Sequence, residues 1–280
     1  MSRISLLSIK VSKREEAGIK TVRFTALGVA VLLLSSCFSS NWLVFVNRDG
    51  SGRISMDFSM EKSVVEMMQG FGGQSEDPPP STSEDLMDEG EMRELAESMG
   101  EGVRFVSAKP LPPGGPSIGY TAIFEFDDIR TVSINPMAGA PSDEEGSDGG
   151  DAVSFDFEEG FRPKLMISIE QDDEESEETP GEAQNPEEAA MMASMMKPFL
   201  GGMSFSVAVE VDGSIRKTNA SFVDGNRITI MDFDMGKILD NDELFGQVVA
   251  ANSVSEEKLQ EDLSAAGIRI ETKELVSVEY

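Results

Sequence analysis

The sequence predicts an α+β fold with a curved, mostly antiparallel sheet, helices packed on one of its faces, and acidic disordered insertions. Three observations lead to this prediction. Apolar and polar residues alternate with a period of two in several segments, which is typical of antiparallel strands with one solvated face. Apolar residues recur at helical spacing between these segments. The order of the two patterns lacks the regular alternation of βαβ proteins.

Strands are expected where the alternation is clearest, at 53–59, 153–158, 164–170 and 203–211. Further strands are expected near 103–108, 118–126, 214–222, 226–233 and 267–278. Within 226–233 the apolar positions change phase between Ile230 and Met231. This change predicts a β-bulge at that point.

Helices are expected where apolar residues share one helical face. Three such faces are Met60, Val64, Met67, Met68 and Phe71; Met92, Leu95, Ala96 and Met99; and Leu259, Leu263 and Ala266. Ser253 and Glu256 have the spacing of a capping box before the third face. A fourth helix is predicted to begin at Asn185, because Asn is a favoured N-cap and Pro186 follows at the first helical position.

The N-terminus has the features of a bacterial lipoprotein signal. Residues 1–23 carry a net charge of +4, and residues 24–36 are uncharged and largely apolar. Thirteen residues are too few for a transmembrane helix, which needs about 20, but they suit the apolar region of a secretory signal. Leu34, Ser35, Ser36 and Cys37 then form a lipobox. The alternative is a buried apolar helix with an ordinary thiol, and the position of this single cysteine favours the lipobox.

The predicted domains are therefore a signal peptide at 1–36 and a single envelope domain at 37–280. Cleavage before Cys37 would leave this cysteine acylated, with palmitate among its chains, and several chains hold a protein stably at a membrane. The expected location is the extracytoplasmic side of the cell envelope. Since residue 38 is not Asp, this would be the periplasmic face of the outer membrane in a diderm bacterium. Phe38–Asn41 is expected to form a tether of about 14 Å.

Composition excludes several classes of function. The chain carries a net charge of −29 and no histidine. Its charge argues against nucleic acid as a partner, and the missing imidazoles exclude Ser-His-Asp catalysis and histidine-ligated zinc. Carboxylate chemistry, Ser–Lys chemistry and oxygen-ligated calcium remain open, but no motif supports them. We therefore expect no catalytic residues, no cofactor and no resident metal.

Acidic residues are concentrated in blocks near 74–84, 138–151 and 171–185, which are predicted to be solvated, disordered loops. Calcium buffering by these blocks is the alternative. Asn47, Asp49 and Ser51 imitate the first half of an EF-hand loop, but Phe58 occupies the position that needs Glu. The segment is better interpreted as a hairpin turn between two strands.

Methionines cluster in the helix that is predicted to follow Asn185. Met192 and Met196 belong to a group of four on one broad helical face. Such a face can be adaptable core, a contact for an apolar ligand or membrane, or a Cu(I) site. If the helix closes over the sheet, Met192 and Met196 would line a groove next to Phe205 and Val207, which makes these four residues the candidate hydrophobic ligand contacts.

Several short motifs resemble a known family. These are the lipobox, the turn at 49–52, the segment 213–220, and the segment 224–228 that follows it. Together they are similar to the LppM-type bacterial lipoprotein domain, although Asp212 stands where that family has proline. The resemblance implies an α+β envelope domain associated with lipid or lipoglycan binding rather than catalysis.

The sequence thus supports two hypotheses. The first is a lipid-anchored, non-enzymatic envelope lipoprotein that binds a lipid-like or hydrophobic partner. The alternative is a structural or assembly lipoprotein that contacts other envelope proteins and binds no small ligand. An apolar groove lined by Met and Phe would distinguish the first from the second.

Overall fold

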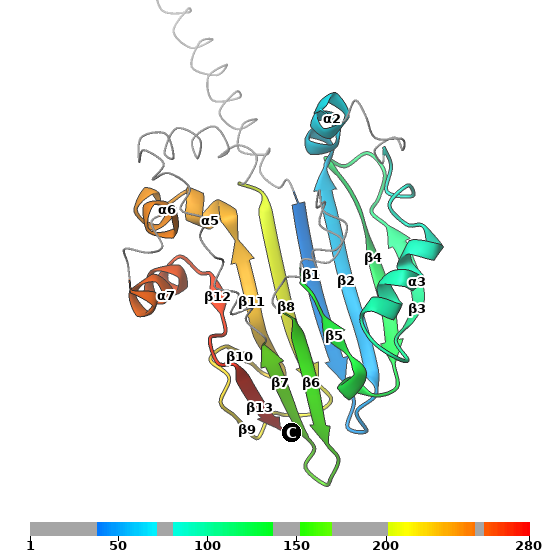
Figure 1. Ribbon diagram of the computed structural model, residues 1–280, viewed down its shortest axis with the longest axis vertical. Coiled ribbons are helices and arrows are strands. Elements are labelled where there is room, and N and C mark those ends of the chain that lie inside the picture. Colours follow the sequence, from blue (N-terminus) through cyan, green and yellow to red (C-terminus); the bar gives the residue numbers. More distant parts are fainter. Residues whose placement is uncertain (1–37, 72–80, 137–151, 170–200, 250–254) are drawn as a thin grey trace, which may run out of the picture. The chain divides into compact units, whose positions relative to one another are not determined.

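The structure, a computed structural model, describes residues 38–71, 81–136, 152–169, 201–249 and 255–280. These residues belong to one compact unit, Ser36–Tyr280, and strands dominate it (Figure 1). The larger sheet contains β1 (Phe38–Val46), β2 (Gly52–Glu61), β3 (Arg104–Pro110), β4 (Ser117–Phe126), β8 (Met203–Val211), β10 (Val223–Asp224), β11 (Arg227–Asp234) and β12 (Arg269–Ile270). The smaller sheet contains β5 (Ser133–Ile134), β6 (Val153–Glu158), β7 (Lys164–Ile169), β9 (Lys217–Thr218) and β13 (Leu275–Glu279).

The larger sheet is built around β1. Its strand order is β10-β11-β8-β1-β2-β4-β3, with β12 beside β11. β1 pairs antiparallel with β2 and parallel with β8, so that Phe38 lies beside Met60 on one side and Met203 on the other. The other strand pairs of this sheet are antiparallel. Alternate residues of β1 are buried along its whole length, as expected for a strand with one face on the core.

The smaller sheet covers one end of the larger sheet. Its order is β5-β6-β7-β13-β9, and buried side chains of both sheets form a single apolar cluster. Gly50, in the β1–β2 turn, marks the contact, because an added Cβ there would lie 2.8 Å from the ring of Phe157 in β6. The carbonyl of Gly50 also accepts a hydrogen bond from the N–H of Ile129, at 2.8 Å.

Five α-helices and one 3₁₀ helix complete the described residues. They are α2 (Lys62–Phe71), α3 (Glu89–Ser98), η1 (Ile129–Thr131), α5 (Met235–Leu239), α6 (Asp242–Val249) and α7 (Glu256–Ala265). The side chain of Asp88 caps α3 by accepting hydrogen bonds from the N–H groups of Gly90 and Glu91. α5, α6, α7 and the segment after them enclose a second, small apolar cluster around Ile238, Leu244 and Ile268.

The α+β class is confirmed, and most of the alternating segments form strands. The expectation of one sheet is wrong, because 153–158 and 164–169 pair with each other and with β13 in a separate sheet. The predicted strand at 214–222 is reduced to the two residues of β9. Met60 was assigned to a helix, but it is a buried residue near the end of β2, and α2 begins only at Lys62.

Two local predictions are confirmed. The register of β11 against β8 shifts between Thr229 and Met231, which places the bulge at Ile230. The turn at 47–51 is a hairpin turn, in which Asp49 accepts hydrogen bonds from the backbone and hydroxyl of Ser51. These two bonds hold the pKa of Asp49 below its usual range, and the bond from the Ser51 hydroxyl contributes most.

Several predictions lie outside the described residues. They concern the signal at 1–36, Cys37, the acidic blocks 138–151 and 171–185, and the helix after Asn185. The predicted capping box of Ser253 and Glu256 is wrong, because α7 begins at Glu256 and its N-cap is Ser255, whose side chain makes no capping bond. Of the first acidic block, residues 81–84 are described and form a turn. Ser83 is buried there, and its hydroxyl accepts a hydrogen bond from the N–H of Gly119 at 3.1 Å. This end of the block is therefore packed on β4.

Candidate functional site

The described chain starts directly in the larger sheet. Phe38 is the first residue of β1, it is buried, and its N–H donates to the carbonyl of Gly202 at 3.1 Å. The expectation that Phe38–Asn41 forms a tether is therefore wrong, since these residues are strand residues paired on both sides. Cys37 directly precedes this strand in sequence, so no spacer separates the predicted acylation position from the folded sheet.

Aromatic side chains cross the larger sheet at the same end as Phe38. They are Phe233 of β11, Phe205 of β8, Phe38 of β1, Phe58 of β2 and Tyr120 of β4. The ring of Phe38 lies 5.1 Å from that of Phe58 and 5.6 Å from that of Phe205, measured between centroids. Phe58 stacks on Tyr120 at 5.3 Å, and Phe205 lies 6.4 Å from Phe233. We call these five side chains the aromatic end.

Strand pairing explains why the aromatic end forms. Phe233 is opposite Phe205, and Phe58 is opposite Tyr120. Between these two pairs the register places Ser40, which is small and buried. Its hydroxyl accepts a hydrogen bond from the indole N–H of Trp42 at 2.9 Å. Aromatic residues from five adjacent strands therefore share one face of the sheet around a small residue.

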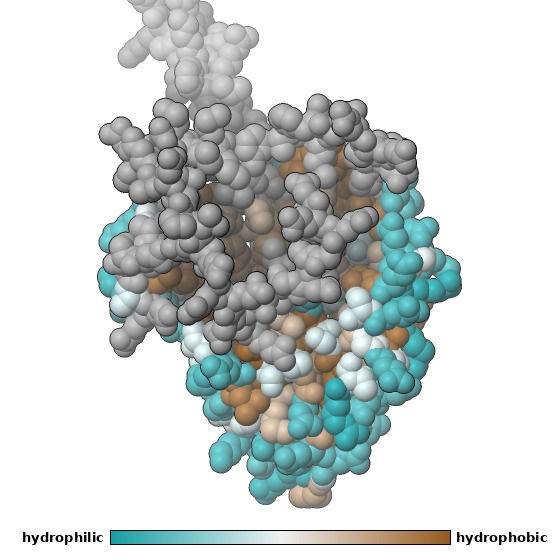
Figure 2. Space-filling view, in the orientation of Figure 1, coloured by the Kyte–Doolittle hydropathy of each residue, from teal (hydrophilic) through white to brown (hydrophobic). Residues whose placement is uncertain are grey.

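Methionines flank Phe38 on both neighbouring strands. Met60 and Met203 are its register partners on β2 and β8. Unbranched thioether side chains adapt to irregular apolar neighbours better than branched ones do. In Figure 2, hydrophobic surface is visible on this face of the larger sheet beyond the smaller sheet. The aromatic end therefore combines flat rings with adaptable side chains, a composition that suits a flexible apolar ligand.

Four side chains of the aromatic end are buried in the apolar core, and Phe233 packs against it. Phe38 retains 8% exposure and Phe205 retains 5%, whereas Val44 and Ile54, nearer the smaller sheet, are completely buried.

Burial raises the pKa of Tyr120 to about 12, with a smaller contribution from the charge of Glu91. The phenol is therefore neutral at physiological pH, and the aromatic end carries no charge of its own.

The opposite face of the same strands is polar. The hydroxyls of Ser39 and Ser59 lie 2.9 Å apart, and the hydroxyl of Ser206 donates to the side-chain oxygen of Asn41 at 2.7 Å. Because successive residues of a strand point to opposite faces, these bonds lie behind the aromatic end. At this end of the sheet the apolar character is thus confined to one side.

The predicted ligand contacts are placed as follows. Phe205 belongs to the aromatic end. Val207, two residues further along β8, is fully buried beside Trp42. Met192 and Met196 lie outside the described residues. Phe38, Phe58, Tyr120 and Phe233 were not proposed from the sequence, although the last three stand in segments that were predicted to be strands.

A serine, a lysine and a carboxylate meet beside β13. Glu271 is almost fully buried and accepts hydrogen bonds from the backbone and hydroxyl of Ser221 and from Lys273. The ammonium of Lys273 also donates to the hydroxyl of Ser221 at 2.6 Å. Since the serine hydroxyl donates to a carboxylate and accepts from an ammonium, this arrangement joins two loops and leaves no free base beside the serine.

Replacing Glu271 tests the structural role of this cluster. Burial raises the pKa of Glu271, but the bonds from Ser221 and Lys273 outweigh burial and hold the pKa below its ordinary value of 4.5. Glu271→Gln should lower the free energy of unfolding by about 2 kcal/mol at neutral pH. The carboxylate stabilises the fold above pH 4.5 and loses this effect as pH falls through its lower folded-state pKa.

Urea unfolding at several pH values measures this effect. The difference between the wild type and Glu271→Gln should shrink below pH 4.5. Glu274→Gln, at an exposed position nearby, is the matched control and should change stability little. A difference that stays constant down to pH 2 would contradict the assignment.

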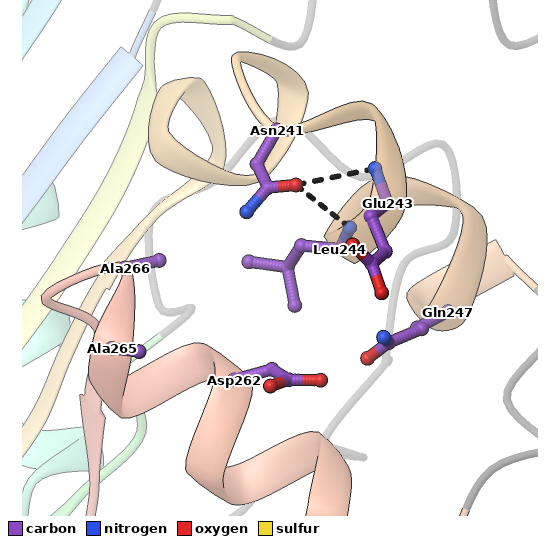
Figure 3. Close-up of a pocket in the computed structure, with 7 residues that line it drawn as sticks. All are labelled: Asn241, Glu243, Leu244, Gln247, Asp262, Ala265 and Ala266. Atoms are coloured by element: carbon purple, nitrogen blue, oxygen red, sulfur yellow. Dashed lines mark hydrogen bonds between the residues drawn. The ribbon is translucent and has the colours of Figure 1, made fainter.

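A small pocket lies between α6 and α7 (Figure 3). It has a volume of about 180 Å³ and is lined by Asn241, Glu243, Leu244, Gln247, Asp262, Ala265 and Ala266. The side-chain oxygen of Asn241 accepts hydrogen bonds from the N–H groups of Glu243 and Leu244 and so caps α6. The buried Oε1 of Gln247 has no partner among the described residues. A donor such as water is needed to complete its bonding.

Within the described residues, no cluster of three or more carboxylate, cysteine or histidine side chains is arranged to hold a metal ion.

Among the same residues, none of the helices has both the length and the apolar character that crossing a membrane requires.

No family model matches this chain, and no curated protein matches its sequence. Among solved structures, the NMR structure of the folded domain of LppM from Mycobacterium tuberculosis is similar to it. The two chains are 10% identical, the match covers 72% of this chain and 85% of the other, and the TM-score is 0.32. A likeness of this degree assigns neither a family nor a function.

Proposed function

We propose that the protein is a lipid-anchored, non-enzymatic lipoprotein of the cell envelope that binds a lipid-like molecule at the aromatic end. An acylated Cys37 would hold it on the extracytoplasmic side of the membrane. The observation that carries the proposal is the position of the aromatic end, which surrounds the residue that directly follows Cys37.

The position of β1 supports the anchoring. With 1–36 removed, the acylated residue would be joined to Phe38 without a spacer, and Phe38 is paired with strands on both sides. The Phe38 end of the larger sheet would then face the membrane. An apolar ligand could pass between the acyl chains of the membrane and the aromatic end over a short distance.

The chemistry of the aromatic end supports an apolar ligand. Its rings are neutral, they form one continuous row, and Met60 and Met203 lie beside the central Phe38. Burial of apolar surface contributes about 25 cal/mol for each Å², so a single acyl chain along this row would supply most of the binding free energy.

A non-enzymatic role is supported by the way the reactive side chains are used. The Ser221–Lys273 pair is bonded to Glu271 and joins two loops. Asp49 and Asp88 are occupied as turn and capping residues. These groups stabilise the backbone around them, and none of them belongs to the aromatic end.

A fluorescent fatty acid tests the proposal. It is titrated against the mature chain carrying Cys37→Ala, which has no acyl chains of its own. Phe38→Ala in this background should weaken probe binding about tenfold or more, because one phenyl ring contributes about 1.5–3 kcal/mol when it is buried. Met192→Ala with Met196→Ala should also weaken binding if the predicted helix contributes to the site.

Phe105→Ala is the matched control. Phe105 is half-buried and contacts Phe124 at a centroid distance of 5.8 Å, away from the aromatic end. Its replacement should leave probe affinity unchanged. Failure of the parent chain to bind the probe, or equal losses in both phenylalanine variants, would overturn lipid binding and leave the structural or assembly role.

A further inference from the structure

A second pocket lies at the opposite end of β1 from Phe38. It has a volume of about 470 Å³ and is lined by Arg48, Phe161, Arg162, Arg216 and Tyr280. This volume is within the range of small-molecule sites, which is about 300–1,000 Å³. Three arginines and no acidic side chain line the pocket, although acids outnumber bases by 52 to 23 in the whole chain.

The arginines come from three separate segments. Arg48 is in the β1–β2 turn, Arg162 is in the β6–β7 turn, and Arg216 precedes β9. In Figure 1, the two turns and the C-terminal end of β13 gather at the same end of the sheets. Tyr280 follows β13 and closes the inner side of the pocket, where its hydroxyl donates to the carbonyl of Asn47 at 3.1 Å.

Hydrogen bonds hold two of the guanidinium groups in place. Arg48 donates to the carbonyl of Phe161 at 3.0 Å, and Arg162 is paired with Glu279 at 3.3 Å. Arg216 donates its backbone N–H to the carbonyl of Glu279, while its guanidinium has no ion-pair partner among the described residues. One arginine is therefore held by a carbonyl, one by a carboxylate, and one is available to a ligand.

Nearby charges define the pocket further. Burial makes the largest contribution to the raised pKa of the Tyr280 phenol. The charge of Arg48 lowers this pKa, and the charges of Asp212 and Asp49 raise it further. Neither aspartate lines the pocket. Phe161, at the tip of the β6–β7 turn, is 92% exposed, so its ring is accessible to a ligand in the pocket.

We propose that this pocket binds a phosphoryl group whose carrier lies on Phe161. Guanidinium groups present paired N–H donors that match the oxygens of a phosphoryl group. Arg216 and Arg48 would contact the phosphoryl oxygens, and Phe161 would cover a ring or apolar part of the same molecule. The carrier is a soluble phosphorylated molecule or a phospholipid headgroup.

The position of the pocket bears on which of these two molecules could supply the phosphoryl group. Phe38 and Val46 are eight residues apart on β1, which corresponds to about 26 Å. If Cys37 anchors the chain as proposed above, a phospholipid in this pocket would belong to a surface other than the anchoring membrane. The pocket itself does not depend on the anchor.

Binding is measured by ³¹P NMR with three probes: inorganic phosphate, phenyl phosphate, and vesicles containing phosphatidylglycerol. Arg216→Gln should weaken binding of the preferred probe about tenfold. Arg93→Gln is the matched control, because Arg93 is an exposed arginine on α3 that pairs with Glu89, and it should leave binding unchanged. Phe161→Ala should weaken phenyl phosphate and leave inorganic phosphate unaffected.

The outcomes separate the sources and decide the proposal. Preference for phenyl phosphate indicates a soluble ligand, whereas preference for vesicles, lost in Arg216→Gln, indicates a headgroup. Absence of binding by all three probes, or equal loss in Arg216→Gln and Arg93→Gln, would overturn the proposal. Both variants should melt like the parent and bind the fluorescent fatty acid normally, so this result is independent of the aromatic end.

Discussion

Cys37→Ala is expected to release the protein from the membrane almost completely. Two or more acyl chains hold a protein stably, whereas a chain without them depends on whatever apolar surface it exposes. The variant is expressed behind a secretory signal that is removed without acylation, so that residues 24–36 cannot retain it. The measurement combines metabolic palmitate labelling with sedimentation of membranes.

Palmitate labelling and sedimentation should give the same result. The parent chain should incorporate palmitate and sediment with membranes, and the variant should do neither. Ser39→Ala, two residues away in β1, is a matched control that keeps the cysteine and should behave like the parent. Palmitate in the variant, or its sedimentation as an integral membrane protein, would contradict the lipoprotein assignment.

Gly52→Ala is expected to destabilise the fold strongly. A Cβ at this position would lie 2.0 Å from the carbonyl oxygen of Phe45 and 2.5 Å from the ring of Phe126. The first of these is a backbone atom of the paired strand, so it cannot move without disturbing the β1–β2 hairpin. Overpacking of this kind costs about 1–3 kcal/mol and sometimes more.

Unfolding is followed by the fluorescence of Trp42, the single tryptophan of the chain, which is buried. Gly246→Ala is the matched control, because Gly246 lies inside α6 and an added Cβ would have no neighbour within 4 Å. That change should stabilise the helix by up to about 1 kcal/mol. Equal stability of the two variants would contradict the packing at Gly52.

Much of the local structure could be predicted from the sequence. The alternation in 153–158 and 203–211 gave β6 and β8, and the change of phase at Ile230 gave the bulge. These features depend on neighbouring residues and on which face is buried. The division into two sheets could not be predicted, because an alternating segment carries no record of the strands with which it pairs.

Strand order also explains why the aromatic end was missed. Its centre depends on the parallel pairing of β1 with β8, whose paired residues are 165 positions apart, as Asn41 and Ser206 are. Phe205 was proposed because its own segment alternates, but the sequence does not show that Phe38 lies beside it. Phe38 was assigned to a tether, because a short polar stretch follows it in the sequence.

The arginine pocket was missed for a similar reason. Arg48, Arg162 and Arg216 are far apart in sequence, and each stands near acidic residues. A charge count along the chain therefore shows no basic segment around any of the three. The pairing of β13 with β7 and β9 brings Arg162 and Arg216 to Tyr280. The hydrogen bond from Tyr280 to the carbonyl of Asn47 then places the turn of Arg48 beside them.

The most direct test of lipid binding at the aromatic end is the lipid content of the protein purified from its native membrane. Organic extraction and mass spectrometry separate bound lipid from the acyl chains that are covalently attached to Cys37. The proposal predicts a bound lipid at about one molecule per chain in the parent and in Phe105→Ala, and much less in Phe38→Ala. Equal lipid content in all three proteins, or none in the parent, would contradict it.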